Sequence, residues 1–152
     1  MPSLSPPSKG MTKTTEARTV RLDVASRFDM LEVVQTVLAH LSSLVGFDDD
    51  ATHYLSVALR ESMVNAIKHG NRFDDLKRVH VEFTFAPKTL RVEVRDEGPG
   101  FDPGGVLDPL APENLLKADG RGIFFMRSFM DDVSYAFPQG GGTVVRMRKT
   151  LK

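Results

Sequence analysis

Three polar side chains recur at four-residue spacing near the middle of the chain: Glu61, Asn65 and His69. Residues four apart lie above one another on a helix, so a helix here would align all three on one face. An asparagine oxygen is a suitable ligand for Mg²⁺ shared with phosphates, and a nearby glutamate can orient or deprotonate a hydroxyl nucleophile. Ordinary solvent-exposed helix faces show the same spacing, so the pattern alone leaves both interpretations open.

A second group of residues follows a stretch that alternates apolar and polar side chains. Asp96 begins the segment Asp-Glu-Gly-Pro-Gly-Phe-Asp, whose glycines are Gly98 and Gly100. An aspartate at a strand end can accept a hydrogen bond from an exocyclic amine, and glycines let the backbone pass close to a flat ring or a phosphate. A tight turn uses the same residue types, and both interpretations remain open.

A third group, Gly120-Arg121-Gly122, directly precedes an apolar segment typical of a helix. The free N–H groups and the positive dipole end of a helix N-terminus can receive phosphate oxygens, and Arg121 adds a charged group there. A simple loop-to-helix junction explains an isolated Gly-x-Gly equally well. The functional prediction therefore depends on the three groups occurring together and in this order.

The first half of the chain predicts the elements that must position the first group. Residues 18–24 alternate polar and apolar side chains, which indicates a strand with one solvated face. Ser26 offers an N-cap for an amphipathic helix, whose apolar residues recur at helical spacing until Gly46. A second helix, capped within residues 48–50, carries the Glu-Asn-His face. We expect it to end near Gly70, because glycine tolerates the left-handed conformation of a C-cap.

The second half of the chain predicts two hairpins, with a long loop and one helix between them. The hairpin strands are residues 79–85 with 90–96 and residues 133–137 with 143–151, the loop is 101–120 and the helix is 121–130. Strands joined mostly as hairpins, with helices able to cover a single face, favour an α+β fold. We predict a two-layer sandwich with a mixed, mostly antiparallel sheet and its helices on one face.

Composition limits the classes of function. A chain of 152 residues with 41% hydrophobic content suits one domain, which we expect over residues 17–152, after a disordered Ser/Thr/Pro-rich tail at residues 1–16. Twenty basic and twenty acidic residues balance, which argues against nonspecific binding to nucleic acid or anionic membranes. No segment suggests a membrane span. The lack of cysteine excludes disulfides and fits the reducing cytoplasm.

The three groups together resemble the GHKL ATPases and, within them, the anti-sigma factor serine kinases. Residues 61–70 resemble the N box of this family, residues 96–102 its first glycine box and residues 120–131 its second. The resemblance extends over about residues 18–151. It implies a Bergerat fold, binding of ATP with Mg²⁺, and a lid over the nucleotide at residues 101–119.

The resemblance also implies roles for single residues. Asp96 would receive the adenine amino group, and Thr143 would support the adenine through a water, although a plain strand threonine is the alternative interpretation. Asn65 would hold Mg²⁺ and Glu61 would be the catalytic base, whereas His69 lies within the N box and is not expected to be a phosphoacceptor. The remaining nucleotide contacts would come from Gly98, Gly100, Gly120, Arg121, Gly122 and Ile123.

The activity that the resemblance implies is that of an ATP-dependent serine-protein kinase and anti-sigma factor. It would phosphorylate a STAS-type anti-anti-sigma partner and sequester a sigma factor, and homodimerisation is implied only in this way. A module that uses ATP to switch partners without phosphorylating them is the alternative. A third hypothesis is a degenerate domain that no longer binds nucleotide, against which the intact Asn65, Asp96 and paired glycines argue.

Overall fold

Five strands form one sheet in the computed structural model, which describes residues 16–99 and 128–151. The strands are β1 (Arg18–Ala25), β2 (Arg78–Ala86), β3 (Thr89–Arg95), β4 (Asp132–Ala136) and β5 (Val144–Thr150). Their order across the sheet is β1-β2-β3-β5-β4, and each neighbouring pair is antiparallel. The two predicted hairpins are therefore confirmed, and β5 lies between β3 and β4.

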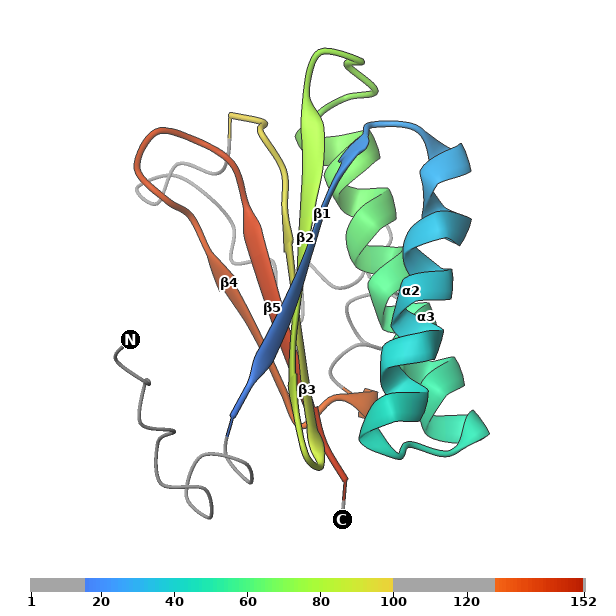
Figure 1. Ribbon diagram of the computed structural model, residues 1–152. Helices are drawn as coiled ribbons and strands as arrows, with labels where there is room; N and C mark the ends of the chain where they lie inside the picture. Colours follow the sequence, from blue (N-terminus) through green and yellow to red (C-terminus); the bar gives the residue numbers. More distant parts are fainter. Residues whose placement is uncertain (1–15, 100–127, 152) are drawn as a thin grey trace, which may run out of the picture.

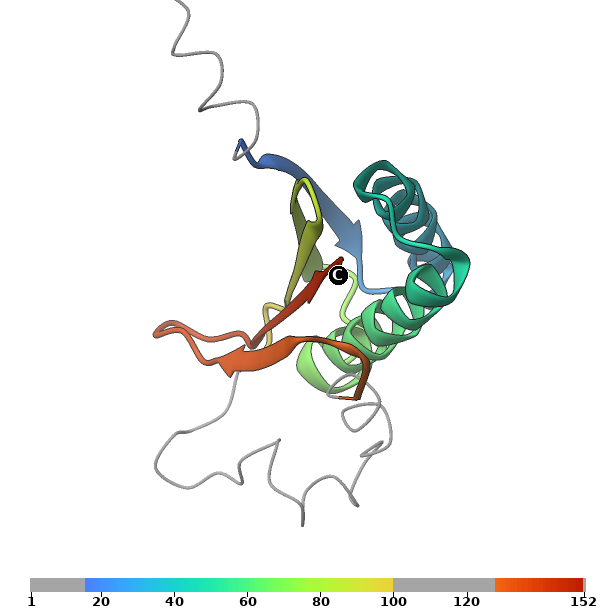
Figure 2. The same cartoon turned by 90° about the horizontal axis from the view of Figure 1, so that it is seen from below.

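The helices form a second layer on one face of this sheet (Figures 1 and 2). They are η1 (Phe28–Met30), α2 (Leu31–Val45), α3 (Asp49–Asn65) and the π-helical turn η2 (Ala66–Gly70) that continues α3. The prediction of a two-layer α+β sandwich is confirmed. Figure 1 places the end of η2, the end of β3 and the turn between β4 and β5 at the same end of the molecule.

Alternating burial along the strands creates the core between the two layers. On β2, Val79, Val81 and Phe83 are buried, and the residues between them face the other side of the sheet. On α2, Leu31, Val34, Leu38 and Leu41 form the buried stripe. Burying one such side chain contributes about 1.5–3 kcal/mol to folding. This core fixes α3 against the sheet and so determines where its polar face lies.

Two of the predicted helix boundaries have the expected local cause. Gly46 ends α2 in a left-handed conformation with φ of 106°, and the Asp48 side chain caps α3 by accepting a hydrogen bond of 2.8 Å from the Ala51 N–H. The predicted N-cap at Ser26 is wrong. The first helical turn begins after Arg27 without a side-chain cap, because the Ser26 hydroxyl instead donates to the Lys77 carbonyl at 2.6 Å.

The segment Phe28–Val45 is the one described helix whose length and apolar content would suffice to cross a membrane. Its buried stripe packs within the core of the sandwich. The core helix of a two-layer domain has the same composition, so this segment gives only weak evidence for a membrane span. The predicted loop over 101–120, most of the helix over 121–130 and nearly all of the tail lie outside the described residues.

Candidate functional site

The end of the helical segment meets the end of β3 in a backbone contact that leaves no room for side chains. A Cβ atom on Gly70 would overlap the Asp96 carboxylate, and a Cβ atom on Gly98 would overlap the Gly70 carbonyl. The prediction that the helix ends near Gly70 is confirmed, but its stated reason is wrong. Gly70 is absent from the residues with positive φ, so close packing and not a left-handed cap requires glycine there.

Asp96 is the buried carboxylate at the centre of this contact, with 5% of its surface exposed. Its Oδ1 accepts hydrogen bonds from the N–H groups of Gly98 at 2.9 Å and Thr143 at 3.2 Å. Among the described residues, no donor reaches Oδ2. Burial raises the pKa of the Asp96 carboxyl, and the two N–H groups oppose this rise. The site therefore contains a buried acceptor atom that suits an N–H donor from a ligand.

The glycine-rich turn before β5 also packs against Asp96. The Gly142 N–H donates to the Gly98 carbonyl at 2.7 Å. Gly142 has φ of 87°, and a Cβ atom there would overlap the backbone oxygen of Asp96. The Asp96 N–H also donates a hydrogen bond to the Thr143 carbonyl at 3.1 Å. The structure therefore brings Asp96, Gly98 and Thr143 together, with the Thr143 N–H as the contact to Asp96, and their predicted roles in binding adenine stay predictions.

Asn71 links these pieces and is a functional candidate that sequence reasoning missed. Its side chain is 1% exposed; its Nδ2 donates to the Ser26 hydroxyl and to the Arg78 carbonyl, both at 2.9 Å, and its Oδ1 accepts from the Glu97 N–H at 2.7 Å. One buried amide thus joins β1, β2 and the turn after β3. Its position directly after the helix-ending glycine was the only available sequence signal.

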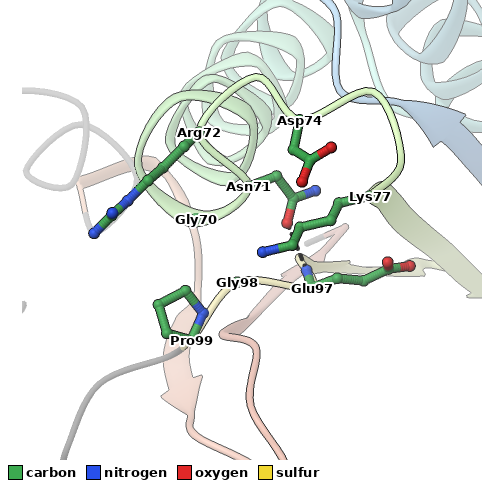
Figure 3. Close-up of a pocket in the computed structure, with 8 residues that line it drawn as sticks. All are labelled: Gly70, Asn71, Arg72, Asp74, Lys77, Glu97, Gly98 and Pro99. Atoms are coloured by element: carbon green, nitrogen blue, oxygen red, sulfur yellow. Dashed lines mark hydrogen bonds between the residues drawn. The ribbon is translucent and has the colours of Figure 1, made fainter.

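A hollow of about 480 Å³ opens beside this contact (Figure 3). Its uncharged lining residues are Gly70, Asn71, Gly98 and Pro99. The charged lining residues are Arg72, Asp74, Lys77 and Glu97. The volume lies in the range of small-molecule sites, roughly 300–1,000 Å³. The hollow adjoins the Asp96 carboxylate through Gly70 and Gly98, which pack against it and against each other.

Glu61 and Asn65 lie further back on α3, one turn apart, and both are half-buried. Their neighbours Ser62 and Met63 face the core, whereas Glu61 and Asn65 keep part of their surface exposed. No group of three His, Asp or Glu side chains suited to a metal occurs in the described part of the chain. A metal here would therefore need phosphate oxygens besides Asn65. Gly100, Gly120, Arg121, Gly122 and Ile123 lie outside the described residues.

The fold and the sequence define a class of protein. The chain belongs to the family of histidine kinase-like ATPase domains, whose model matches residues 24–149. Serine-protein kinase RsbW of Listeria monocytogenes is 24% identical over 132 residues, which are 83% of this chain and 84% of that protein. Serine-protein kinase RsbW of Halalkalibacterium halodurans is 23% identical over 143 residues, which are 90% and 86% of the two chains.

Two solved structures share the fold. The structure of the RsbU and RsbW domains of a Mycobacterium tuberculosis protein matches 88% of this chain with a TM-score of 0.64 and 16% identity, and the match spans 32% of that longer chain. The catalytic domain of histidine kinase ThkA matches 86% of this chain and 97% of its own, with a TM-score of 0.52 and 11% identity. At these identities the likeness concerns the fold alone.

Proposed function

We propose that this chain binds Mg-ATP and that Asp96 recognises the adenine. The observation that carries the proposal is the buried Asp96 carboxylate, whose Oδ1 is occupied by two backbone N–H groups while Oδ2 lacks a donor among the described residues. The exocyclic amine of adenine supplies such a donor, whereas guanine presents an oxygen at the same ring position. The site therefore fits ATP better than GTP.

The helix face adds the groups that phosphoryl transfer requires. Asn65 would hold Mg²⁺ through its amide oxygen, and Glu61, one turn earlier on α3, would accept the proton of an attacking serine hydroxyl. Bound ATP would supply the phosphoryl group: the serine oxygen bonds to the γ-phosphorus, the bond to the β,γ-bridging oxygen breaks, and ADP leaves. The phosphate cradle would come from Gly100, Gly120, Arg121, Gly122 and Ile123.

We propose that the product is a phosphoserine on a STAS-type anti-anti-sigma partner, and that the chain sequesters a sigma factor in the cytoplasm. Support comes from the relatives named serine-protein kinase RsbW, which align with most of this chain. The homodimer suggested by the resemblance belongs to the same proposal.

The test is phosphotransfer by a Glu61→Gln variant. We expect transfer from labelled ATP to a STAS protein to fall by about 100-fold or more, the size of general-base contributions, while the ATP dissociation constant stays near the wild-type value. Glu32→Gln, which alters an exposed glutamate on α2, is the matched control and should leave transfer unchanged. Transfer by Glu61→Gln at the wild-type rate would reject Glu61 as the base.

The same assay separates the kinase from a partner-switching module. A kinase gives a labelled STAS partner whose label disappears when its acceptor serine is replaced by alanine. Nucleotide-dependent binding of the partner without any label would instead favour the switching module. A flat calorimetric titration with Mg-ATP would favour a degenerate domain and would reject both.

A further inference from the structure

Lys77 brings a positive charge into the hollow beside Asp96. In Figure 3 its side chain extends across the hollow towards Gly98 and Gly70, the two glycines that pack around the Asp96 turn. Lys77 is half-buried. None of the ion pairs between described residues includes it. Its ammonium group is therefore not neutralised by a direct carboxylate contact within this part of the chain.

The backbone of Lys77 is fixed by the same buried network that holds the Asp96 turn. Its N–H donates to the Asp74 carbonyl at 3.0 Å, and its carbonyl accepts from the Ser26 hydroxyl at 2.6 Å. That hydroxyl accepts from Asn71, whose Oδ1 holds the N–H of Glu97, the residue after Asp96. The Asn71 side-chain amide is therefore shared by the hydrogen bonds that hold Lys77 and those that hold the Asp96 turn.

Lys77 also acts on Asp96 through its charge. Burial raises the pKa of the Asp96 carboxyl, and the groups that oppose the rise are, in order, the Gly98 and Thr143 N–H groups, Lys77 and Arg95. Arg95 is adjacent in sequence but exposed on β3, so solvent screens it more strongly. The charged and titratable groups on the elements around Asp96 are Lys68 and His69 on the helix end, Arg72, Asp74, Asp75 and Lys77 on the loop, Arg78 and His80 on β2, and Arg95 and Glu97 beside it.

We propose that Lys77 is a positioning residue of the adenine site, whose ammonium group keeps the buried Asp96 carboxylate ionised so that it can accept the exocyclic amine. A protonated Asp96 would present an O–H group and would lose acceptor capacity towards that amine. A lysine that does not pair directly with Asp96 favours the ionised form while leaving Oδ2 available to the ligand. This inference rests on the proposed binding of ATP.

The first experiment needs no nucleotide. The carboxyl carbon of Asp96 is followed by NMR as the pH is lowered, in the wild-type protein and in Lys77→Met, Lys77→Arg and Arg95→Met. We expect the Asp96 midpoint to move to higher pH in Lys77→Met, to move less in Arg95→Met and to stay near the wild-type value in Lys77→Arg. An unchanged midpoint in Lys77→Met, or equal shifts in Lys77→Met and Arg95→Met, would overturn the inference.

The second experiment measures ATP binding by calorimetry over the same pH range. We expect Lys77→Met to bind ATP about three- to tenfold more weakly at a pH near the Asp96 midpoint that the first experiment measures, the effect of one charge acting through partly solvated protein. The deficit should shrink as the pH rises and Asp96 ionises in both proteins. Lys77→Arg should restore binding, which a loss of packing alone would not predict.

The two experiments separate failure of this inference from failure of the proposed function. If wild-type protein binds ATP and Lys77→Met binds it with the same pH dependence, Lys77 has no positioning role and the proposed function stands. If wild-type protein does not bind ATP, the adenine site is rejected together with the role of Lys77 in it. Should Lys77→Met fail to fold, Lys77→Gln provides the same charge removal with a polar side chain.

Discussion

The end of η2 and the last turns of α3 before it contribute to the candidate site by different means. At Gly70 the backbone of η2 touches the Asp96 carboxylate and the turn at Gly98, with no space for a methyl group. One to two turns earlier, Glu61 and Asn65 present half-buried side chains on the helix face. The first region depends on close backbone packing and on the N–H groups that hold Asp96 Oδ1, whereas the second would contribute side-chain chemistry in the proposed function. Substitutions of the glycines in the first region should therefore damage packing, whereas substitutions of Glu61 or Asn65 should affect only chemistry.

The largest effect is expected from a substitution that disrupts the close packing between η2 and the Asp96 turn. Gly98→Ala places a Cβ atom against the Gly70 carbonyl, a backbone atom that cannot rotate away. We expect a loss of about 3 kcal/mol in the free energy of unfolding, the upper part of the usual range for overpacking, and no measurable ATP binding. Urea denaturation and calorimetry measure the two effects.

Gly140→Ala is the control for this substitution. Gly140 has φ of 99° and a Cβ atom there meets nothing within 4 Å, so only backbone strain of about 1 kcal/mol is expected. ATP binding should persist in this variant. If Gly98→Ala were as stable as Gly140→Ala and still bound ATP, the close contact between η2 and the Asp96 turn would not be required.

Asp96→Asn changes the chemistry of the packed region without changing its volume. The amide oxygen can still accept hydrogen bonds from Gly98 and Thr143, but the amide NH₂ group would then occupy the place of Oδ2. Because the NH₂ group and the adenine amine are both hydrogen-bond donors, they could not bond to each other. We expect ATP to bind about 10- to 100-fold more weakly, the loss for a hydrogen bond to a charged group. Calorimetric titration of both proteins with Mg-ATP measures this change.

The stability of Asp96→Asn provides the internal control. Because burial raises the folded pKa of Asp96 above its ordinary value of 3.8, the ionised carboxylate costs stability at neutral pH, and this cost is released as the pH falls through the folded pKa. The neutral amide removes this cost, so the free energy of unfolding of the variant should lie within about 1 kcal/mol of the wild-type value at neutral pH. A strongly destabilised variant would instead identify Asp96 as a structural residue.

The same contrast explains what the sequence could predict. Asp48 and Gly46 were predictable because a helix cap depends on residues within one turn. Ser26 was not, since its hydroxyl bonds to groups 45 and 51 residues away. The helix end near Gly70 was predicted correctly but for the wrong reason, because glycine is required there by the close contact with Asp96, which follows β3. The order of the three motifs indicated the family, whereas contacts between residues far apart in the sequence assemble the surroundings of Asp96.

His80 provides the smallest expected effect, on the solvent side of the Asp96 turn. Its Nδ1 lies 2.6 Å from Asp23 Oδ1 and its Nε2 lies 2.5 Å from Glu97 Oε2. A neutral imidazole has a single N–H, so donation to both carboxylates requires the protonated ring. Partial burial lowers the pKa of His80, but the two hydrogen bonds outweigh it and raise the pKa above 6.5.

The raised pKa determines how a His80→Gln variant should depend on pH. The stabilisation by His80 is fully present below the ordinary imidazole pKa of 6.5, which applies to the unfolded chain, and is lost as the pH rises through the higher folded pKa. Because the ring and both carboxylates are more than a third exposed, we expect His80→Gln to cost at most about 1 kcal/mol in mildly acidic solution. Urea denaturation should show this difference vanishing in alkaline solution. An equal loss at both pH values would mean that His80 stabilises the turn by packing and not by its charge.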